Sequence, residues 1–248
     1  MKKIYLASCL TISIALSSCS NFLDVEPTNA VEADKAISTA NDAKVLINGL
    51  MRKLSSSSYY GRNFMLYGDV KGGDFTILSQ GRGMDYLYVF NHSESSNSFS
   101  SVWTQGYNSL AQINNLLANI EKLKAEGSTE NFDTYVGQAL TTRALINFDL
   151  VRLYGEPYNE NKDALGVPNV TKILDYSAQE LRTTVAENYK QILEDLKAAE
   201  SLLPKAKANG YLNYYGNKAL QARVYLYMED YSNALTAARE IIDSKAYK

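Results

Sequence analysis

Apolar residues recur every three or four positions through much of the second half of the chain, which is the spacing of one face of an α-helix. The most regular series runs from Trp103 to Leu123, and Gly127 follows it as a stop. Similar spacing predicts a second helix over about 132–154 and a third over about 185–203. Because only a short loop joins the first two helices, we expect them to pack antiparallel.

The end of the chain carries the small and aromatic positions of a tetratricopeptide hairpin. These positions are Ala222, Tyr225, Asp230, Tyr231 and Ala234. Gln221 and Ile241 depart from the pattern, since a larger apolar residue and an alanine are expected there. A repeat unit buries its apolar face only against its neighbours, so several helix pairs in series are typical of a repeat array. We therefore predict an all-α fold of tetratricopeptide-like hairpins.

The first half of the chain holds one helix of this kind and then loses the pattern. Asn41-Asp42 offers an N-cap, apolar residues recur over 43–54, and four serines, 55–58, end the run. Six glycines crowd the next stretch, 59–101, without the spacing of a phosphate-binding loop. We expect a Gly/Ser/Tyr-rich loop region there, with one short β-like piece over Tyr86–Phe90.

The first residues carry an export signal. A basic start leads into an apolar run of roughly a dozen residues, which is shorter than the about 20 that a membrane span needs. The run ends in Leu16-Ser17-Ser18-Cys19, which resembles the bacterial lipobox, so Cys19 is expected to become the lipidated first residue. The alternative is a plain signal peptide with an incidental cysteine. The expected parts are a lipoprotein signal peptide (1–18), a lipidated tether (19–40) and a helical domain (41–248).

The cysteine count and the net charge argue against a disulfide-stabilised protein and against a nucleic-acid-binding protein. The other cysteine, Cys9, lies inside the expected signal peptide, so the mature chain forms no internal disulfide and depends on burial for its stability. Removal of Lys2 and Lys3 changes the formal net charge from -2 to -4. Because no run of Lys or Arg is present to neutralise phosphates, nucleic acid is not an expected partner.

Few residues are available for catalysis or metal binding. His92 is the single histidine, and it lies in a polar stretch where we expect it to be exposed. Asp69, Asp74 and Asp85 lie around Gly72-Gly73, so a glycosidase-like carboxylate pair or a weak cation site is formally open. Aspartates also favour turns and stay solvated there, which is the simpler interpretation. We expect no enzyme activity, no metal and no cofactor.

Tyrosine is the dominant aromatic residue, with 19 copies against one Trp and seven Phe. Tyrosines on helix stripes, such as Tyr107, Tyr189 and Tyr225, are expected in the core. Those in the glycine-rich region suit a different use, because a flat ring can cover the apolar face of a sugar while polar neighbours bond its hydroxyls. The candidate ligand-binding residues are Tyr59, Tyr60, Tyr86 and Tyr88, with packing across the helices as the alternative for each.

An ordered set of short motifs resembles the SusD/RagB family of nutrient-binding outer-membrane lipoproteins. The motifs are Cys19 with Phe22-Leu23-Asp24 and Pro27, Trp103, Tyr107, Asn114-Asn115, Gly137-Gln138-Ala139, Arg143-Ala144, Leu153-Tyr154-Gly155, Gly166-Val167-Pro168, Tyr189, Ile192-Leu193, Asp195-Leu196, Ala198-Ala199, Lys218-Ala219 and Ala222–Leu226. One departure is Gln138, where the family usually has glutamate, so any pairing of this position with Arg143 is at best a neutral hydrogen bond. Members of the family are about twice as long, and the chain resembles their N-terminal half.

The resemblance implies a function that no single motif could establish. It implies a lipoprotein held at the outer membrane through Cys19, facing the cell surface, that binds a glycan and delivers it to a SusC-like TonB-dependent transporter. The tetratricopeptide-like helices of this half are associated with docking on that transporter. Ligand residues cannot be transferred position by position, since much of the family's ligand surface comes from loops and from the second half.

Three other functions stay open at this point. A helical-repeat adaptor would bind only protein and no nutrient, and the ligand of a nutrient receptor could be peptide rather than glycan. An enzyme would depend on Asp69, Asp74 or Asp85.

Overall fold

The computed structural model describes residues 37–78, 85–91, 93, 100–207 and 210–247. The helices within them are α2 (Ala40–Leu54), α3 (Asn63–Gly72), α4 (Asp85–Tyr88), α5 (Ser100–Ala125), α6 (Asp133–Tyr154), α7 (Tyr158–Asn161), α8 (Val185–Glu200), α9 (Tyr214–Tyr227) and α10 (Tyr231–Asp243). Their only β pairing is an isolated bridge between Leu165 and Thr184. The all-α expectation is confirmed for the described part of the chain, whereas Cys19 and His92 lie outside it.

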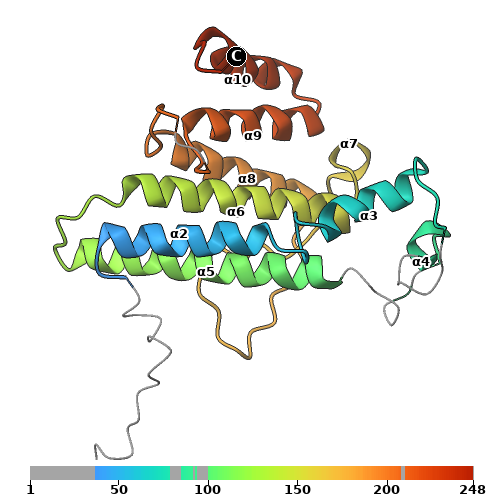
Figure 1. Cartoon of the computed structure of the whole chain (residues 1–248), viewed down its shortest axis with the longest axis horizontal. Coiled ribbons are helices and arrows are strands. Elements are labelled where there is room, and N and C mark those ends of the chain that lie inside the picture. Colours follow the sequence, from blue (N-terminus) through green and yellow to red (C-terminus); the bar gives the residue numbers. More distant parts are fainter. Residues whose placement is uncertain (1–36, 79–84, 92, 94–99, 208–209, 248) are drawn as a thin grey trace, which may run out of the picture. The chain divides into compact units, whose positions relative to one another are not determined.

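Helices α5 and α6 form the antiparallel pair that the apolar spacing predicted, and α2 packs against both (Figure 1). On α5 the predicted face is buried, with Leu110 fully inaccessible to solvent. Helix α6 is buried on several sides, because α8 and α9 also pack against it. Two of its buried polar side chains bond within the helix: the hydroxyls of Thr141 and Thr142 donate to backbone carbonyls one turn earlier, at 2.8 and 2.7 Å.

Helices α6, α8, α9 and α10 follow one another as a series of packed neighbours, as Figure 1 shows. The segment that follows α8 approaches α6 closely at Gly137, where an added Cβ would lie 2.8 Å from the Cγ of Leu203. A capping box starts α8: the Thr184 hydroxyl accepts from the Glu187 amide, and the Glu187 carboxylate accepts from the Thr184 amide. This serial packing is the arrangement expected of tetratricopeptide-like hairpins.

The glycine-rich region differs from its prediction. Residues expected to be loops form α3, which continues through Gly68 and ends at Gly73, whose φ of +81° suits a residue without a Cβ. The prediction of a short β-like piece is wrong, since Asp85–Tyr88 forms a short helix, α4, in which Leu87 is buried. The aromatic run Tyr86–Phe90 carries strand propensity, but no neighbouring strand pairs with it among the described residues.

The start of α2 also differs from its prediction by two residues. Thr39 is the N-cap, and its hydroxyl accepts from the Asp42 amide at 3.2 Å. The Asp42 carboxylate accepts in return from the Thr39 amide at 2.8 Å, which completes a capping box. Hydrogen bonds from Ser38 and Thr39 lower the pKa of Asp42, so the expected cap residue contributes as the third helical position instead.

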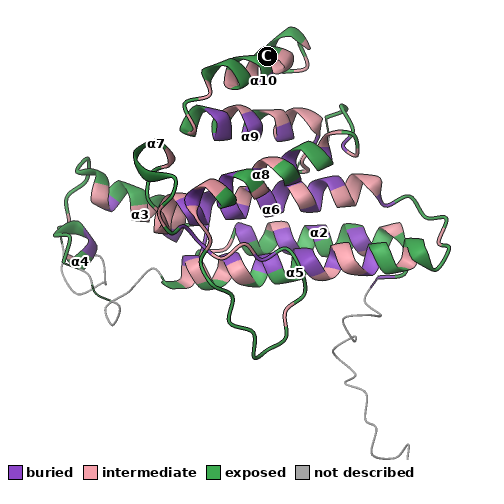
Figure 2. Cartoon of the chain, turned by 180° about the vertical axis from the view of Figure 1, so that it is seen from behind, coloured by how far each residue is buried: buried purple, intermediate pink, exposed green. Residues whose placement is uncertain are grey.

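Burial is concentrated in the middle of the helix series, as Figure 2 shows in purple on α5, α6 and α8. The last helix is different, because Ala237 is the only residue of α10 that is fully buried. Its large apolar side chains Tyr231, Leu235 and Ile242 are 63%, 50% and 71% exposed. Among the described helices, none combines the length and the apolar content that crossing a bilayer requires.

Candidate functional site

The structure divides the four candidate tyrosines into two pairs. Tyr59 and Tyr60 lie in the turn between α2 and α3, and the ring of Tyr59 is 0% exposed. Tyr86 and Tyr88 lie on α4 and are 50% and 37% exposed. The prediction of a ligand-facing ring is therefore wrong for Tyr59, because packing covers both faces of the ring. Tyr86 and Tyr88 remain candidates.

The buried pair of tyrosines surrounds a carboxylate of α6. The hydroxyl of Tyr59 donates to Oδ2 of Asp149 at 3.1 Å, and the hydroxyl of Tyr60 donates to the same oxygen. Burial raises the pKa of Asp149, against the opposing effect of the hydrogen bonds and of the neighbouring Arg152. Burial and the adjacent carboxylate also raise the pKa of Tyr59 and of Tyr60, so both hydroxyls stay protonated donors.

Arg152 completes this buried cluster one turn along α6. Its Nη2 lies 2.5 Å from Oδ1 of Asp149, and its guanidinium carbon lies 4.4 Å from the ring centre of Phe148. Burial acts against the charged form of Arg152, but the nearby carboxylate keeps its pKa above the ordinary value. The charge of Asp149 is therefore balanced by Arg152 on the same helix, and the face of Phe148 lies against the guanidinium cation.

The exposed tyrosines belong to an aromatic surface that comprises α3, α4 and the residues that directly follow each helix. Its large apolar side chains and their exposed fractions are Met65 56%, Phe75 58%, Leu78 94%, Tyr86 50%, Tyr88 37%, Val89 61% and Phe90 65%. Lys71 lies among them, with its ammonium 5.0 Å from the ring centre of Tyr67 and 5.8 Å from that of Phe90. Exposed large apolar side chains gathered in one region of the chain are typical of a binding region.

The aspartates of the same region lie at or near the protein surface. Asp69 on α3 and Asp74 after it are exposed, and Asp85 at the start of α4 is half-buried. The described residues hold no group of three or more His, Cys, Asp or Glu side chains placed to bind a metal ion. The positions of Asp69 and Asp74 fit solvated surface carboxylates.

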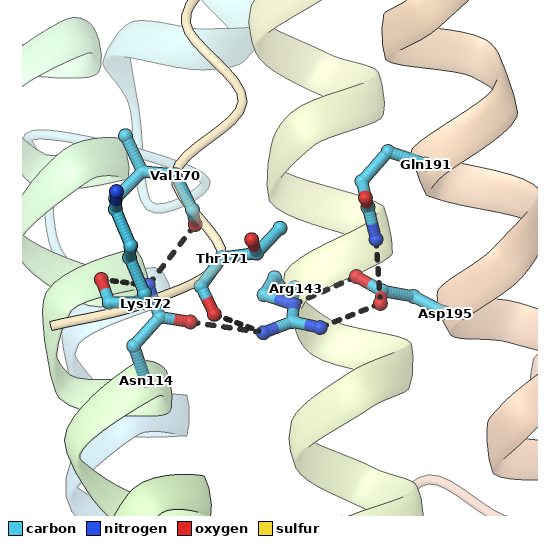
Figure 3. Close-up of polar contacts among 7 residues, drawn as sticks. All are labelled: Asn114, Arg143, Val170, Thr171, Lys172, Gln191 and Asp195. Atoms are coloured by element: carbon cyan, nitrogen blue, oxygen red, sulfur yellow. Dashed lines mark hydrogen bonds and ion pairs between the residues drawn. The ribbon is translucent and has the colours of Figure 1, made fainter. Parts of the chain in front are cut away.

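A second buried ion pair joins α6 to α8, and the sequence analysis did not predict it. Arg143 donates from Nε and Nη2 to the two carboxylate oxygens of Asp195, at 2.7 and 2.6 Å. Its Nη1 donates to Oδ1 of Asn114 at 3.0 Å and to the carbonyl of Thr171 at 3.2 Å (Figure 3). Gln191 donates to Asp195 at 3.1 Å. The sequence offered one indication of this pair, because Arg143 and Asp195 are charged residues on otherwise apolar helix faces.

Asn114 extends this network to a loop. Its amide donates to the carbonyls of Val170 and Lys172 at 3.0 and 3.1 Å, which holds this segment against α5 (Figure 3). Gln138 has no part in it, because its amide donates to the carbonyl of Leu212 at 3.2 Å. The departure at Gln138 therefore leaves the pairing of Arg143 intact.

A cavity of about 590 Å³ lies beside this network, between α5, α6 and the segment around Thr171–Ile173. Leu117, Ile120 and Leu140 are among its lining residues. The polar groups of Asn114 and Arg143 that border it already bond within the protein. Glu121, Lys124 and Lys172 also line the cavity and supply its other charged groups.

The serial helix pairs and the exposed aromatic surface describe a tetratricopeptide-like binding protein. The chain belongs to the SusD-like family, because residues 21–226 match the family model described as "Starch-binding associating with outer membrane". It is 26% identical to SusD-like protein P2 of Formosa agariphila over 251 residues, which cover 99% of this chain and 47% of the relative.

Solved structures agree with this assignment. A SusD superfamily protein from Bacteroides vulgatus superposes with a TM-score of 0.77 at 32% identity, over 84% of this chain and 47% of that one. Another, from Bacteroides thetaiotaomicron, gives 0.73 at 34% identity, over 83% and 46%. The resemblance drawn from the sequence motifs is confirmed, and the chain spans about half the length of the relatives it matches.

Proposed function

We propose that this protein is an outer-membrane lipoprotein that binds a glycan and delivers it to a TonB-dependent, SusC-like transporter. The family match over residues 21–226 carries the proposal, since that family is described as starch-binding and associated with the outer membrane. The mechanism needs no catalysis. Binding beside the transporter raises the local concentration of the ligand, and the transporter complex supplies the energy for uptake.

The aromatic surface on α3 and α4 is the proposed glycan contact, and Tyr86 and Tyr88 are its binding residues. Their rings are partly open to solvent, so each can cover the apolar face of a sugar ring. Asp85 and Asn91 adjoin them in the chain and offer oxygens and an amide for sugar hydroxyls. Tyr60 is bonded to Asp149 and is better suited to supporting this surface than to contacting a ligand.

Membrane attachment is proposed to come from lipid on Cys19, with the mature protein on the cell surface. The support is the lipobox-like Leu16-Ser17-Ser18-Cys19 and the family's association with the outer membrane. Each buried methylene of an acyl chain contributes about 0.8 kcal/mol, so several chains give lasting attachment. Palmitate labelling of the wild type and of Cys19→Ala in the native host tests this step.

Titration with soluble starch tests the glycan contact. Tyr86→Ala and Tyr88→Ala are each expected to weaken binding roughly fivefold, which is the effect of losing about 1 kcal/mol of ring contact. Tyr176→Ala is the matched control, because Tyr176 is 101% exposed but lies outside α3 and α4. Equal affinity of all three variants and the wild type would contradict the assignment of the site.

One observation favours a protein-binding adaptor as the second candidate function. Helix α10 exposes Tyr231, Leu235 and Ile242, an apolar stripe that a further helix could cover. An adaptor would bind its partner through such helix faces and show no affinity for any glycan. Glycan titration therefore separates the two functions, and a peptide series in the same assay tests peptide as the nutrient.

A further inference from the structure

The two helices that carry the aromatic surface are joined to the other helices by few buried residues. Helix α3 buries only Asn63 and Val70 along its length, and α4 buries only Leu87. Asn63 donates to the hydroxyl of Ser101 on α5 at 2.8 Å. Phe64, Leu66 and Tyr67 of α3 are only half-buried against the core, so the turn from which α3 starts has a large share in fixing its orientation.

That starting turn is fixed to α6 through one carboxylate. Tyr59 and Tyr60 precede α3 by only a few residues, and both hydroxyls donate to Oδ2 of Asp149. The rings add packing: Tyr59 stacks on Phe64 of α3 at 5.5 Å between ring centres, and Tyr60 meets Phe64 edge-on at 5.0 Å. The polar bonds and the ring contacts therefore connect α6, the turn and the first turn of α3.

Asp149 is itself held in place. Its second oxygen, Oδ1, pairs with Arg152 at 2.5 Å, and the guanidinium of Arg152 lies 4.4 Å from the ring centre of Phe148. The side chain of Asp149 is 1% exposed, so water does not compete for its bonds. A buried carboxylate with fixed partners on both oxygens gives the two tyrosine hydroxyls a single position to occupy.

We propose that Asp149 is a positioning residue for the proposed glycan-binding surface: by holding Tyr59 and Tyr60, it sets the direction in which α3 and α4 leave the helix series. Asp149 does not touch the ligand. The expected change in glycan affinity rests on the proposed function. The expected change in the position of α3 does not depend on any ligand.

Hydrogen–deuterium exchange on the full chain in detergent tests the proposal. In the double variant Tyr59→Phe, Tyr60→Phe the rings remain and only the hydroxyls are lost. We expect the amides of α3 to exchange about tenfold faster, the effect of removing buried hydrogen bonds, with no change in α8. Tyr107→Phe is the matched control, because its hydroxyl donates to the carbonyl of Pro168, outside α3 and α4.

Starch titration of the same variants separates positioning from general stability. The proposal predicts weaker starch binding by the Tyr59→Phe, Tyr60→Phe variant and wild-type binding by Tyr107→Phe. Unchanged exchange in α3, equally faster exchange in every helix, or faster exchange in α3 with unchanged starch binding would each overturn it. Faster exchange in α3 when the wild type binds no starch would support the positioning of α3 and contradict the glycan function.

Discussion

Asp149 is a buried acid whose ionisation is linked to folding. Burial raises the pKa of Asp149 in the folded protein, so the native state binds its proton more tightly than the unfolded state does. The stabilising contribution is fully present below the unfolded pKa and is lost as pH rises through the folded pKa. Asp149→Asn removes this titration while keeping the size of the side chain.

The resulting prediction concerns a difference between two unfolding curves. As pH falls from 7 towards 4, the melting temperature of the wild type should rise relative to that of Asp149→Asn. Thermal unfolding of both proteins across this range measures the difference. A wild-type melting temperature that instead falls relative to the variant would show that the pKa of Asp149 is lowered on folding.

The second buried pair predicts a non-additive result. Asp195→Ala leaves the guanidinium of Arg143 buried without a charge partner, and this should cost about 3–5 kcal/mol in the free energy of unfolding. Arg143→Met with Asp195→Leu should cost far less, because no charge then stays buried. The exposed pair Lys190–Glu194 on α8 is the control, with an expected effect of about 0.3–0.5 kcal/mol on breaking.

Urea unfolding of these variants checks the prediction. Equal costs for Asp195→Ala and for Lys190→Ala would contradict the assignment of Arg143 and Asp195 as a buried, mutually dependent pair. These two residues stood in the recognised motifs, yet their contact joins positions 52 residues apart, which apolar periodicity cannot predict.

At the scale of helices, the chain offers two glycines with opposite surroundings. Gly137→Ala should lower the free energy of unfolding by about 1–3 kcal/mol, because its Cβ would lie 2.8 Å from Leu203. Gly68→Ala should raise it by about 0.5–1 kcal/mol, since Gly68 is helical, exposed and has open space around it. Urea unfolding measures both, and a destabilising Gly68→Ala would contradict the helix α3.

The sequence predicted the helices whose apolar faces are regular. The series from Trp103 to Leu123 lies within α5, and the predicted second helix, 132–154, differs from α6 by one residue. Helices α3 and α4 were not predicted because glycines and aromatic residues there favour loop and strand locally. The first turn of α3 is stabilised by contacts with Tyr59, Tyr60 and Ser101, which local propensity does not include.

The candidate site was also predictable only in part from the sequence. Sequence reasoning selected an aromatic-rich region and chose four tyrosines, but it could not separate Tyr59 from Tyr86. Their difference comes from Asp149, which lies 90 residues from Tyr59 in the chain. Local structural propensity carries no information about which tyrosine will bond to a carboxylate that is distant in the chain.

At the scale of the whole molecule, the series of packed helices supplies a rigid support and the aromatic surface occupies its least buried elements. Helices α5, α6 and α8 contribute most to the buried core, whereas α3 and α4 expose large apolar side chains. Binding surfaces drawn from weakly buried elements on a stable support are common. The family to which the chain belongs is described as starch-binding and associated with the outer membrane, and glycan uptake there is our proposal.

The most direct test is capture of the protein from detergent-solubilised native outer membranes, with mass spectrometry of the bound proteins and of the intact chain. Our account predicts a TonB-dependent barrel in amounts close to those of the captured protein, and a lipid-modified mass beginning at Cys19. Capture of the lipidated protein without any such barrel would contradict the proposed uptake complex and favour the adaptor function.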